Sequence, residues 1–167
     1  MKFSIPAFTL IECMIVTALV AVLTMITASS FSFMRAWLVR ADIDTLATVC
    51  RYAQQSALML GQQQEIILDP VQRCYHFNDH TYYLSPGVFF GTVPHVKGPP
   101  ASPGTTLSKP ITFVNNRILC YEHGVISSGA VYLTDTSRSV LYALSNAVSH
   151  SSFLRKYTYH GTWLPLT

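Results

Sequence analysis

The sequence predicts an α+β fold in which one long N-terminal helix precedes a head of antiparallel strands. Three observations support this prediction. Residues 13–34 are long enough for a membrane-length helix and contain no charged side chain. A helical periodicity then continues to residue 60, and only short strand-like runs follow it. Because helices and strands do not alternate along the chain, a parallel sheet is not expected.

Length and composition agree with one modest domain joined to an apolar segment. The chain has 167 residues, of which 50% are hydrophobic and 11% are charged. This apolar fraction is high for a soluble protein, but it is natural once the first 34 residues are set aside. The formal net charge of +3 is too weak to imply a nucleic-acid partner by itself.

The apolar segment, residues 8–34, is predicted to be the transmembrane half of the helix, because about 20 apolar residues cross the hydrocarbon core. Its single acid is Glu12. A carboxylate inside lipid costs roughly 2.5–3.5 kcal/mol, so this acid needs a partner. No Lys or Arg follows it before Arg35. Cleavage after Ala7 would supply one, since the new α-amino group of Phe8 would lie one helical turn away.

Residues 35–61 are predicted to be an amphipathic half of the same helix. Apolar residues recur there at spacings of four and three, which is typical of a helix with one buried face. They are Val39, Ile43, Leu46, Cys50, Ala53, Ala57 and Leu60. Gly61 offers a C-terminal cap. We expect this half to pack on a globular head formed by residues 62–167.

The head is predicted to consist of short strands. Residues 65–70 and 73–77 flank a turn and are expected to form a hairpin. Further strand-like runs occupy residues 82–84, 88–90, 111–114, 118–121, 130–133, 139–144 and 153–157. Residues 92–110 are rich in Pro and Gly and are predicted to form a surface loop.

The start of the chain carries a recognisable pattern. A short leader, residues 1–7, has the basic residue Lys2 and ends in Ala7, and it is followed by Phe8-Thr9-Leu10-Ile11-Glu12. This pattern resembles the class III signal of type IV pilins and type II secretion pseudopilins. The resemblance implies that prepilin peptidase removes the leader, that Phe8 becomes the N-methylated first residue, and that Glu12 guides assembly. Ala7 stands where the family usually has Gly.

The head adds to this resemblance. The residues concerned are 84–91, Ile111-Thr112-Phe113, Gly124, and Ser128-Gly129 before Val131-Tyr132-Leu133. They are similar to the β-rich head of the GspH/FimT class of minor pseudopilins, which carries two small sheets. The full prediction is therefore a pilin-like α+β fold: a long helix, with a transmembrane half and an amphipathic half, packed on an antiparallel head with two small sheets.

The resemblance also implies a function. The chain would be a minor pseudopilin, a structural subunit of the type II secretion pseudopilus that serves protein export. Its expected partners are other pilin or pseudopilin subunits, prepilin peptidase, the inner-membrane assembly platform and membrane lipid. Its expected location is the bacterial inner membrane, as a single-pass protein with the head in the periplasm, and then the assembled filament.

Four cysteines occupy positions 13, 50, 74 and 120. Cys13 lies in the apolar segment and Cys50 on the helix after it, which leaves Cys74 and Cys120, both in predicted strands, as the candidate disulfide if the head faces an oxidising compartment. The other interpretation is that the cysteines are buried thiols that act as small hydrophobic side chains.

The sequence offers little support for an enzyme. It has no Gly-rich phosphate loop, no nucleophile elbow and no zinc-protease motif. His76 and His80 flank Asp79, but at a strand end and turn this spacing does not bring ligands together, so no metal site is predicted. No cofactor is expected.

Two other functions stay open. Near the C-terminus, the basic residues Arg155, Lys156 and His160 lie among the aromatic residues Tyr157, Tyr159 and Trp163, a composition found where proteins contact nucleic-acid strands. The chain could thus be a minor type IV pilin, for pilus assembly or competence, that binds DNA; the simpler interpretation is a last strand with one solvated face. The second alternative is a single-pass membrane-anchored binding domain unrelated to pili.

Overall fold

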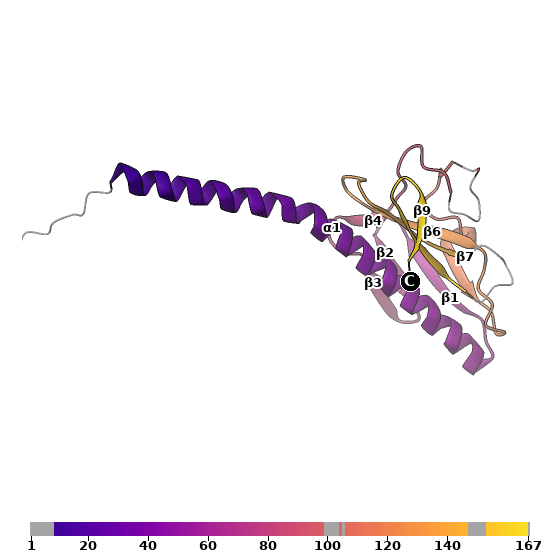
Figure 1. The fold of residues 1–167 in the computed structure, drawn as a ribbon. Helices are drawn as coiled ribbons and strands as arrows, with labels where there is room; N and C mark the ends of the chain where they lie inside the picture. Colours follow the sequence, from indigo (N-terminus) through magenta and orange to yellow (C-terminus); the bar gives the residue numbers. More distant parts are fainter. Residues whose placement is uncertain (1–8, 99–103, 105, 147–152, 167) are drawn as a thin grey trace, which may run out of the picture. The chain divides into compact units, whose positions relative to one another are not determined.

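The computed structural model describes residues 9–98, 104, 106–146 and 153–166, with the backbone alone for residues 26–33. Within these ranges the chain has a helix, α1 (Leu10–Leu60), a short 3-10 helix, η1 (Val114–Asn116), and nine strands (Figure 1). The strands are β1 (Gln64–Asp69), β2 (Cys74–Phe77), β3 (His80–Tyr83), β4 (Val88–Phe90), β5 (Arg117–Cys120), β6 (Gly129–Asp135), β7 (Leu141–Asn146), β8 (Arg155–Tyr159) and β9 (Trp163–Leu166).

The chain divides into two compact units, Met1–Met34 and Arg35–Thr167, and this division corrects the predicted fold class. The side chains of α1 are described in two parts, residues 10–25 and 34–60. These two parts belong largely to different units. The predicted fold class, one long N-terminal helix with a transmembrane half and an amphipathic half packed on the head, is therefore wrong. No helix in the described part of the chain, α1 included, has a run of apolar residues that could cross a bilayer.

The predicted transmembrane half, residues 8–34, and the predicted single-pass location in the inner membrane are thus wrong as well. A span needs about 20 consecutive apolar residues. The described side chains of the first unit are those of residues 9–25 and Met34, and they include the carboxylate of Glu12.

Sheet A has the strand order β3-β2-β1-β5, with every pair antiparallel. Ile66 of β1 is opposite Phe77 of β2 on one side and Ile118 of β5 on the other. All three are buried, so they mark the inner face of the sheet. The predicted hairpin at residues 65–77 is confirmed by β1 and β2. The Asp69 carboxylate accepts hydrogen bonds from the backbone amides of Val71 and Gln72 at its turn.

Sheet B has the order β4-β6-β7-β8-β9, again antiparallel throughout. Its central strands β6 and β7 are buried on both faces. Val131 and Leu144 face the core shared with α1, whereas Tyr132 and Ala143 face a second cluster. That second cluster includes Val96, which is 4% exposed, so this part of the segment predicted as a surface loop instead covers sheet B.

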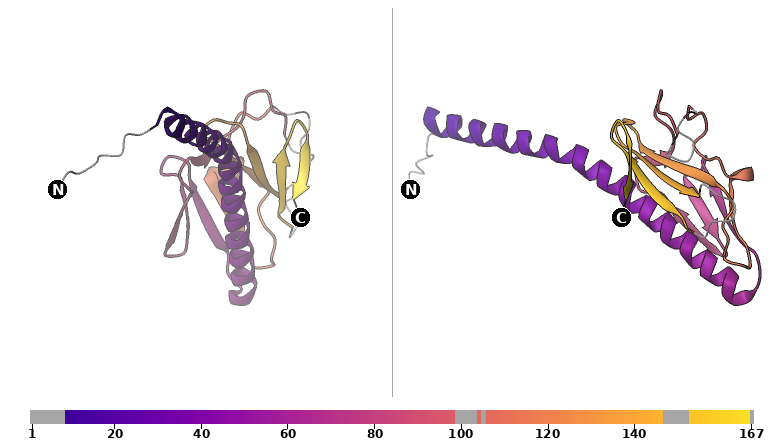
Figure 2. Two further views of the ribbon diagram at one scale, coloured as in Figure 1. Left: turned by 60° about the vertical axis from the view of Figure 1, so that its left-hand side comes forward. Right: turned by 45° about the vertical axis from the view of Figure 1, so that its right-hand side comes forward.

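The later part of α1 packs against both sheets within the second unit (Figure 2). The predicted apolar stripe is confirmed from Val39 to Ala57, while Leu60 is exposed. The helix ends at Leu60 and is followed by Gly61, whose φ is +60°, and the amide of Gln62 donates to the carbonyl of Ala57 at 3.3 Å. This is the Schellman termination that a glycine after the last helical residue favours.

Candidate functional site

The first turn of α1 is closed by reciprocal hydrogen bonds between Thr9 and Glu12. The Glu12 amide donates to the Thr9 hydroxyl at 3.3 Å, and the Thr9 amide donates to Oε2 of Glu12 at 2.8 Å. The Thr9 hydroxyl also donates to Oε2 at 2.8 Å. This arrangement is a capping box, which satisfies two of the amides that a helix start leaves without partners.

The capping box sets the state of Glu12. The hydrogen bond from the Thr9 amide, together with that from the Thr9 hydroxyl, holds the pKa of this carboxyl below its usual value of 4.5. The carboxylate is therefore ionised at neutral pH, and its charge is favourable at the positive end of the helix dipole. The T-x-x-E spacing was readable in the sequence but was not used there. Ala7 and Phe8, the predicted processing residues, lie outside the described residues.

Apart from Glu12 in the first turn, the surface of residues 10–25 is apolar on all sides. Ten large hydrophobic side chains there are at least half exposed. They are Leu10, Ile11, Met14, Ile15, Val16, Leu19, Val20, Val22, Leu23 and Met25. The hydroxyls do not interrupt this surface, because Thr17 donates to the carbonyls of Cys13 and Met14, each at 3.0 Å, and Thr24 donates to that of Ala21 at 2.8 Å. A helix that is apolar all round is normally buried.

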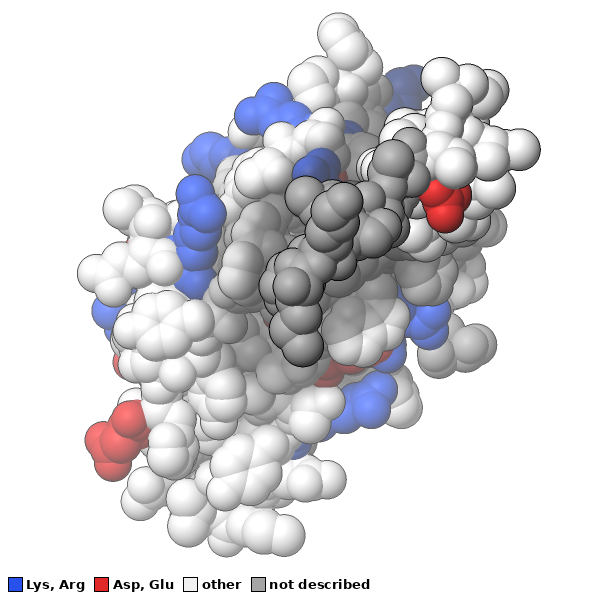
Figure 3. Space-filling model, turned by 90° about the vertical axis from the view of Figure 1, so that its left-hand side faces the viewer, with Lys and Arg blue, Asp and Glu red and all other residues white. Residues whose placement is uncertain are grey.

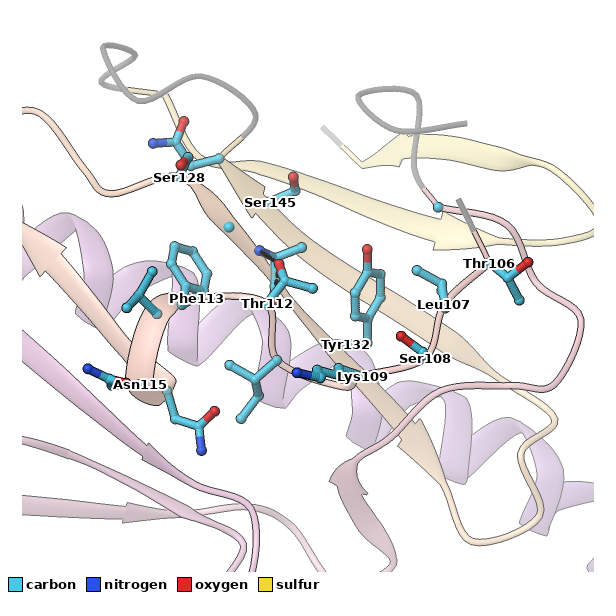
Figure 4. A pocket seen from close by; sticks show the side chains of 17 residues that line it. Thr106, Leu107, Ser108, Lys109, Thr112, Phe113, Asn115, Ser128, Tyr132 and Ser145 are labelled. Carbon is cyan, nitrogen blue, oxygen red and sulfur yellow. Dashed lines mark hydrogen bonds between the residues drawn. The ribbon is translucent and has the colours of Figure 1, made fainter. Parts of the chain in front are cut away.

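The head carries a polar groove of about 660 Å³ on sheet B (Figure 4). Lys109, Thr112 and Phe113 line it from the segment before η1, and Tyr132 and Ser145 line it from the strands behind. Burial raises the pKa of Tyr132 to about 12, so its hydroxyl stays neutral. Among the described residues of the groove there is no Asp, Glu, His or Cys. The groove offers neutral hydroxyl and amide groups and one amine, which can bind polar groups but supply no acid–base pair.

The two cysteines of the predicted disulfide lie on opposite faces of sheet A. Cys120 lies two residues after the inner Ile118, whereas Cys74 lies three residues before the inner Phe77. All four thiols are free in the structure. Sγ of Cys74 is 3.5 Å from Nε2 of His76. The structure therefore does not bring Cys74 and Cys120 together.

Arg155 and Lys156, the two residues of the predicted DNA contact, have different surroundings in the structure. Nζ of Lys156 is 2.6 Å from a carboxylate oxygen of Asp44 on α1, so its charge is paired within the head. Arg155 is exposed. Among the residues coloured in Figure 3, uncharged ones (white) cover most of the surface, and Lys and Arg (blue) lie between them. Because Arg155 and Lys156 do not act as a matched pair of free cations, the described geometry gives the DNA-binding alternative no added support.

The histidines considered as metal ligands have other neighbours. Nδ1 of His76 is 2.9 Å from the Thr81 hydroxyl, and the ring of His80 packs edge-on against Tyr82. In the part of the chain that the structure describes, His, Cys, Asp and Glu side chains form no group of three able to hold a metal ion.

Comparison with known proteins found no matching protein-family model, no matching characterised protein and no matching solved structure. The resemblance to type IV pilins and pseudopilins therefore stays a prediction from the residues quoted from the sequence.

Proposed function

We propose that the chain is a structural subunit of a pilin-like filament, a minor pseudopilin of the type II secretion kind, which prepilin peptidase cleaves before Phe8 and methylates there. It assembles through residues 10–25 of α1 and serves protein export. The proposal assigns it no catalytic activity. The observation that supports it is the exposed, apolar surface of this part of the helix.

The exposed apolar surface of residues 10–25 is large enough that burying it against other apolar groups is strongly favourable. Fully burying one large aliphatic side chain is worth roughly 1.5–3 kcal/mol, and ten such side chains are at least half exposed here. A single partner helix would cover one stripe and leave the other sides in water. Several neighbours are needed, and copies of the same helix meet this need because each is apolar on every side. A helical filament supplies such neighbours.

Glu12 has a defined place in this proposal. The described contacts of its carboxylate use Oε2, which the capping box holds at the start of the helix. Cleavage after Ala7 would create a positive charge at Phe8, of the same subunit or of a neighbour. Pairing of that amine with Glu12 would avoid two uncompensated charges in a bundle of apolar helices, where each is costly.

The test is the mass and N-terminal sequence of the protein recovered from its own host. A chain that begins with N-methylated Phe8 is expected. A chain that begins at Met1, or one cut beyond residue 25, would contradict the proposal, because either would remove the amine that Glu12 is expected to meet.

A further inference from the structure

Two cysteines that the sequence analysis did not pair lie together in the core of the head. Cys50 is on α1 and Cys120 ends β5, and both are fully buried. Sγ of Cys120 is 3.9 Å from the backbone carbonyl oxygen of Cys50. The two residues belong to the same hydrophobic cluster.

Contacts made by the next two turns of α1 hold Cys50 beside Cys120. Gln54, one turn after Cys50, donates from Nε2 to the carbonyl of Gly124 at 2.6 Å. Leu58, one turn later again, packs so closely on Gly124 that a β-carbon there would lie 3.0 Å from its side chain. α1 therefore runs beside residues 120–124 over three turns, and this packing keeps Cys50 next to Cys120.

The other two cysteines have different surroundings. Cys74 is on the opposite face of sheet A, next to His76. Cys13 is exposed in the first unit. Cys50 and Cys120 are the only two of the four cysteines for which the described contacts place the thiol of one against the backbone of the other.

We propose that Cys50 and Cys120 form a disulfide that ties α1 to β5. One thiolate attacks a sulfur of a disulfide oxidant, such as glutathione disulfide or an oxidised dithiol protein, and releases one thiol of that oxidant. The second cysteine then displaces the remaining oxidant thiol. The two cysteines lose two protons and two electrons in total, and the disulfide of the oxidant becomes two thiols.

The surroundings indicate when this bond forms. Burial raises the pKa of Cys120 to about 12, and burial with the nearby Cys120 raises that of Cys50 well above its usual value. Thiolate is the reactive form, so it is scarce once the core has closed. The bond is therefore expected to form while the chain folds and to resist reductants afterwards.

The cross-link has a consequence that rests on the proposed function. If the subunit is held in a filament through residues 10–25, a force on the helix reaches the head through α1. A bond from Cys50 to β5 would carry that force covalently. The cross-link itself does not depend on this role, and its failure would leave the N-terminal test of the filament proposal unaffected.

The experiment uses the full chain, refolded in mild detergent with reduced and oxidised glutathione, then alkylated in denaturant and digested with trypsin. Two alkylated cysteines, Cys13 and Cys74, are expected instead of four. Tryptic peptides 41–51 and 118–138 are expected as one linked species that separates on reduction. Four alkylated cysteines, or a link that includes peptide 74–97, would overturn the proposal.

Matched variants distinguish the bond from general effects of cysteine loss. Cys74→Ala is expected to keep the linked peptides, whereas Cys50→Ala and Cys120→Ala lose them. Reduction in denaturant followed by refolding without oxidant should lower the melting midpoint of the wild type by about 10 °C. The midpoint of Cys50→Ala should not respond to oxidant. If that variant does not fold, the peptide map of the wild type still decides the question.

Discussion

The two described parts of α1 are both helical, but their apolar side chains are distributed differently. Residues 10–25 carry apolar side chains in every direction, and these are exposed. From Val39 to Ala57 the apolar side chains follow one stripe, and that stripe is buried against two sheets. Both parts are helical, so the helical backbone does not determine what each part contacts. The arrangement of the apolar side chains around the helix does.

The sharpest test of this contrast replaces the same residue type in each part. Leu46→Ala removes a fully buried side chain and is expected to lower the free energy of unfolding of the head by about 2–5 kcal/mol. Leu19→Ala removes a side chain that is 58% exposed and should change it by no more than about 0.5 kcal/mol. Denaturant unfolding followed by circular dichroism measures both. Equal losses would show that the two parts do not differ as described.

A charge in the first part should affect assembly and leave the head stable. Leu19→Asp would place an unpaired carboxylate among apolar helices, so filament recovery should fall at least about tenfold. Met59→Asp, at an exposed site of the second part, is the control and should assemble normally. Sedimentation of sheared filaments gives the measurement. Normal recovery of Leu19→Asp would remove residues 10–25 from the proposed assembly surface.

A smaller effect is expected where the second part meets sheet B. Lys156→Met removes the ion pair with Asp44, whose side chain is 42% exposed, so the head should lose about 0.5–1 kcal/mol. Asp44→Asn should cause a similar loss, and Lys109→Met, at an exposed site of the polar groove, should cause none. Thermal unfolding of the three variants at low and high salt tests this. A stable Lys156→Met that no longer bound DNA would favour the competence alternative instead.

The smallest effect concerns the first turn of α1. Because its folded pKa is lowered, Glu12 stabilises this turn fully above its usual value of 4.5, and the contribution is lost as the pH falls through the lowered value. Thr9→Val removes the hydroxyl donor and should move the pKa of Glu12 back toward 4.5. Carboxyl NMR titration of both chains measures this. An unchanged pKa in Thr9→Val would mean that the hydroxyl makes no contribution.

Some features were predictable because they depend on residues close together in the chain. The stripe from Val39 to Ala57 follows from a repeat of four and three, and the end of the helix follows from Gly61. The capping box of Thr9 and Glu12 is equally local, but from the sequence Glu12 was interpreted as an acid in the apolar segment and as the assembly residue, and not as a helix cap. Counting apolar residues also gave a transmembrane half that the described helix does not have.

The sequence by itself determined the helix periodicity, the first hairpin and the turn residues, since each depends on backbone preferences within a few positions. Only the tertiary structure decided which cysteines meet, because the face of a strand residue depends on its register with a neighbour. It also decided that Val96 covers sheet B and that Lys156 pairs with Asp44. These contacts join residues far apart in the chain, and their energies exist only once both sheets have closed on α1.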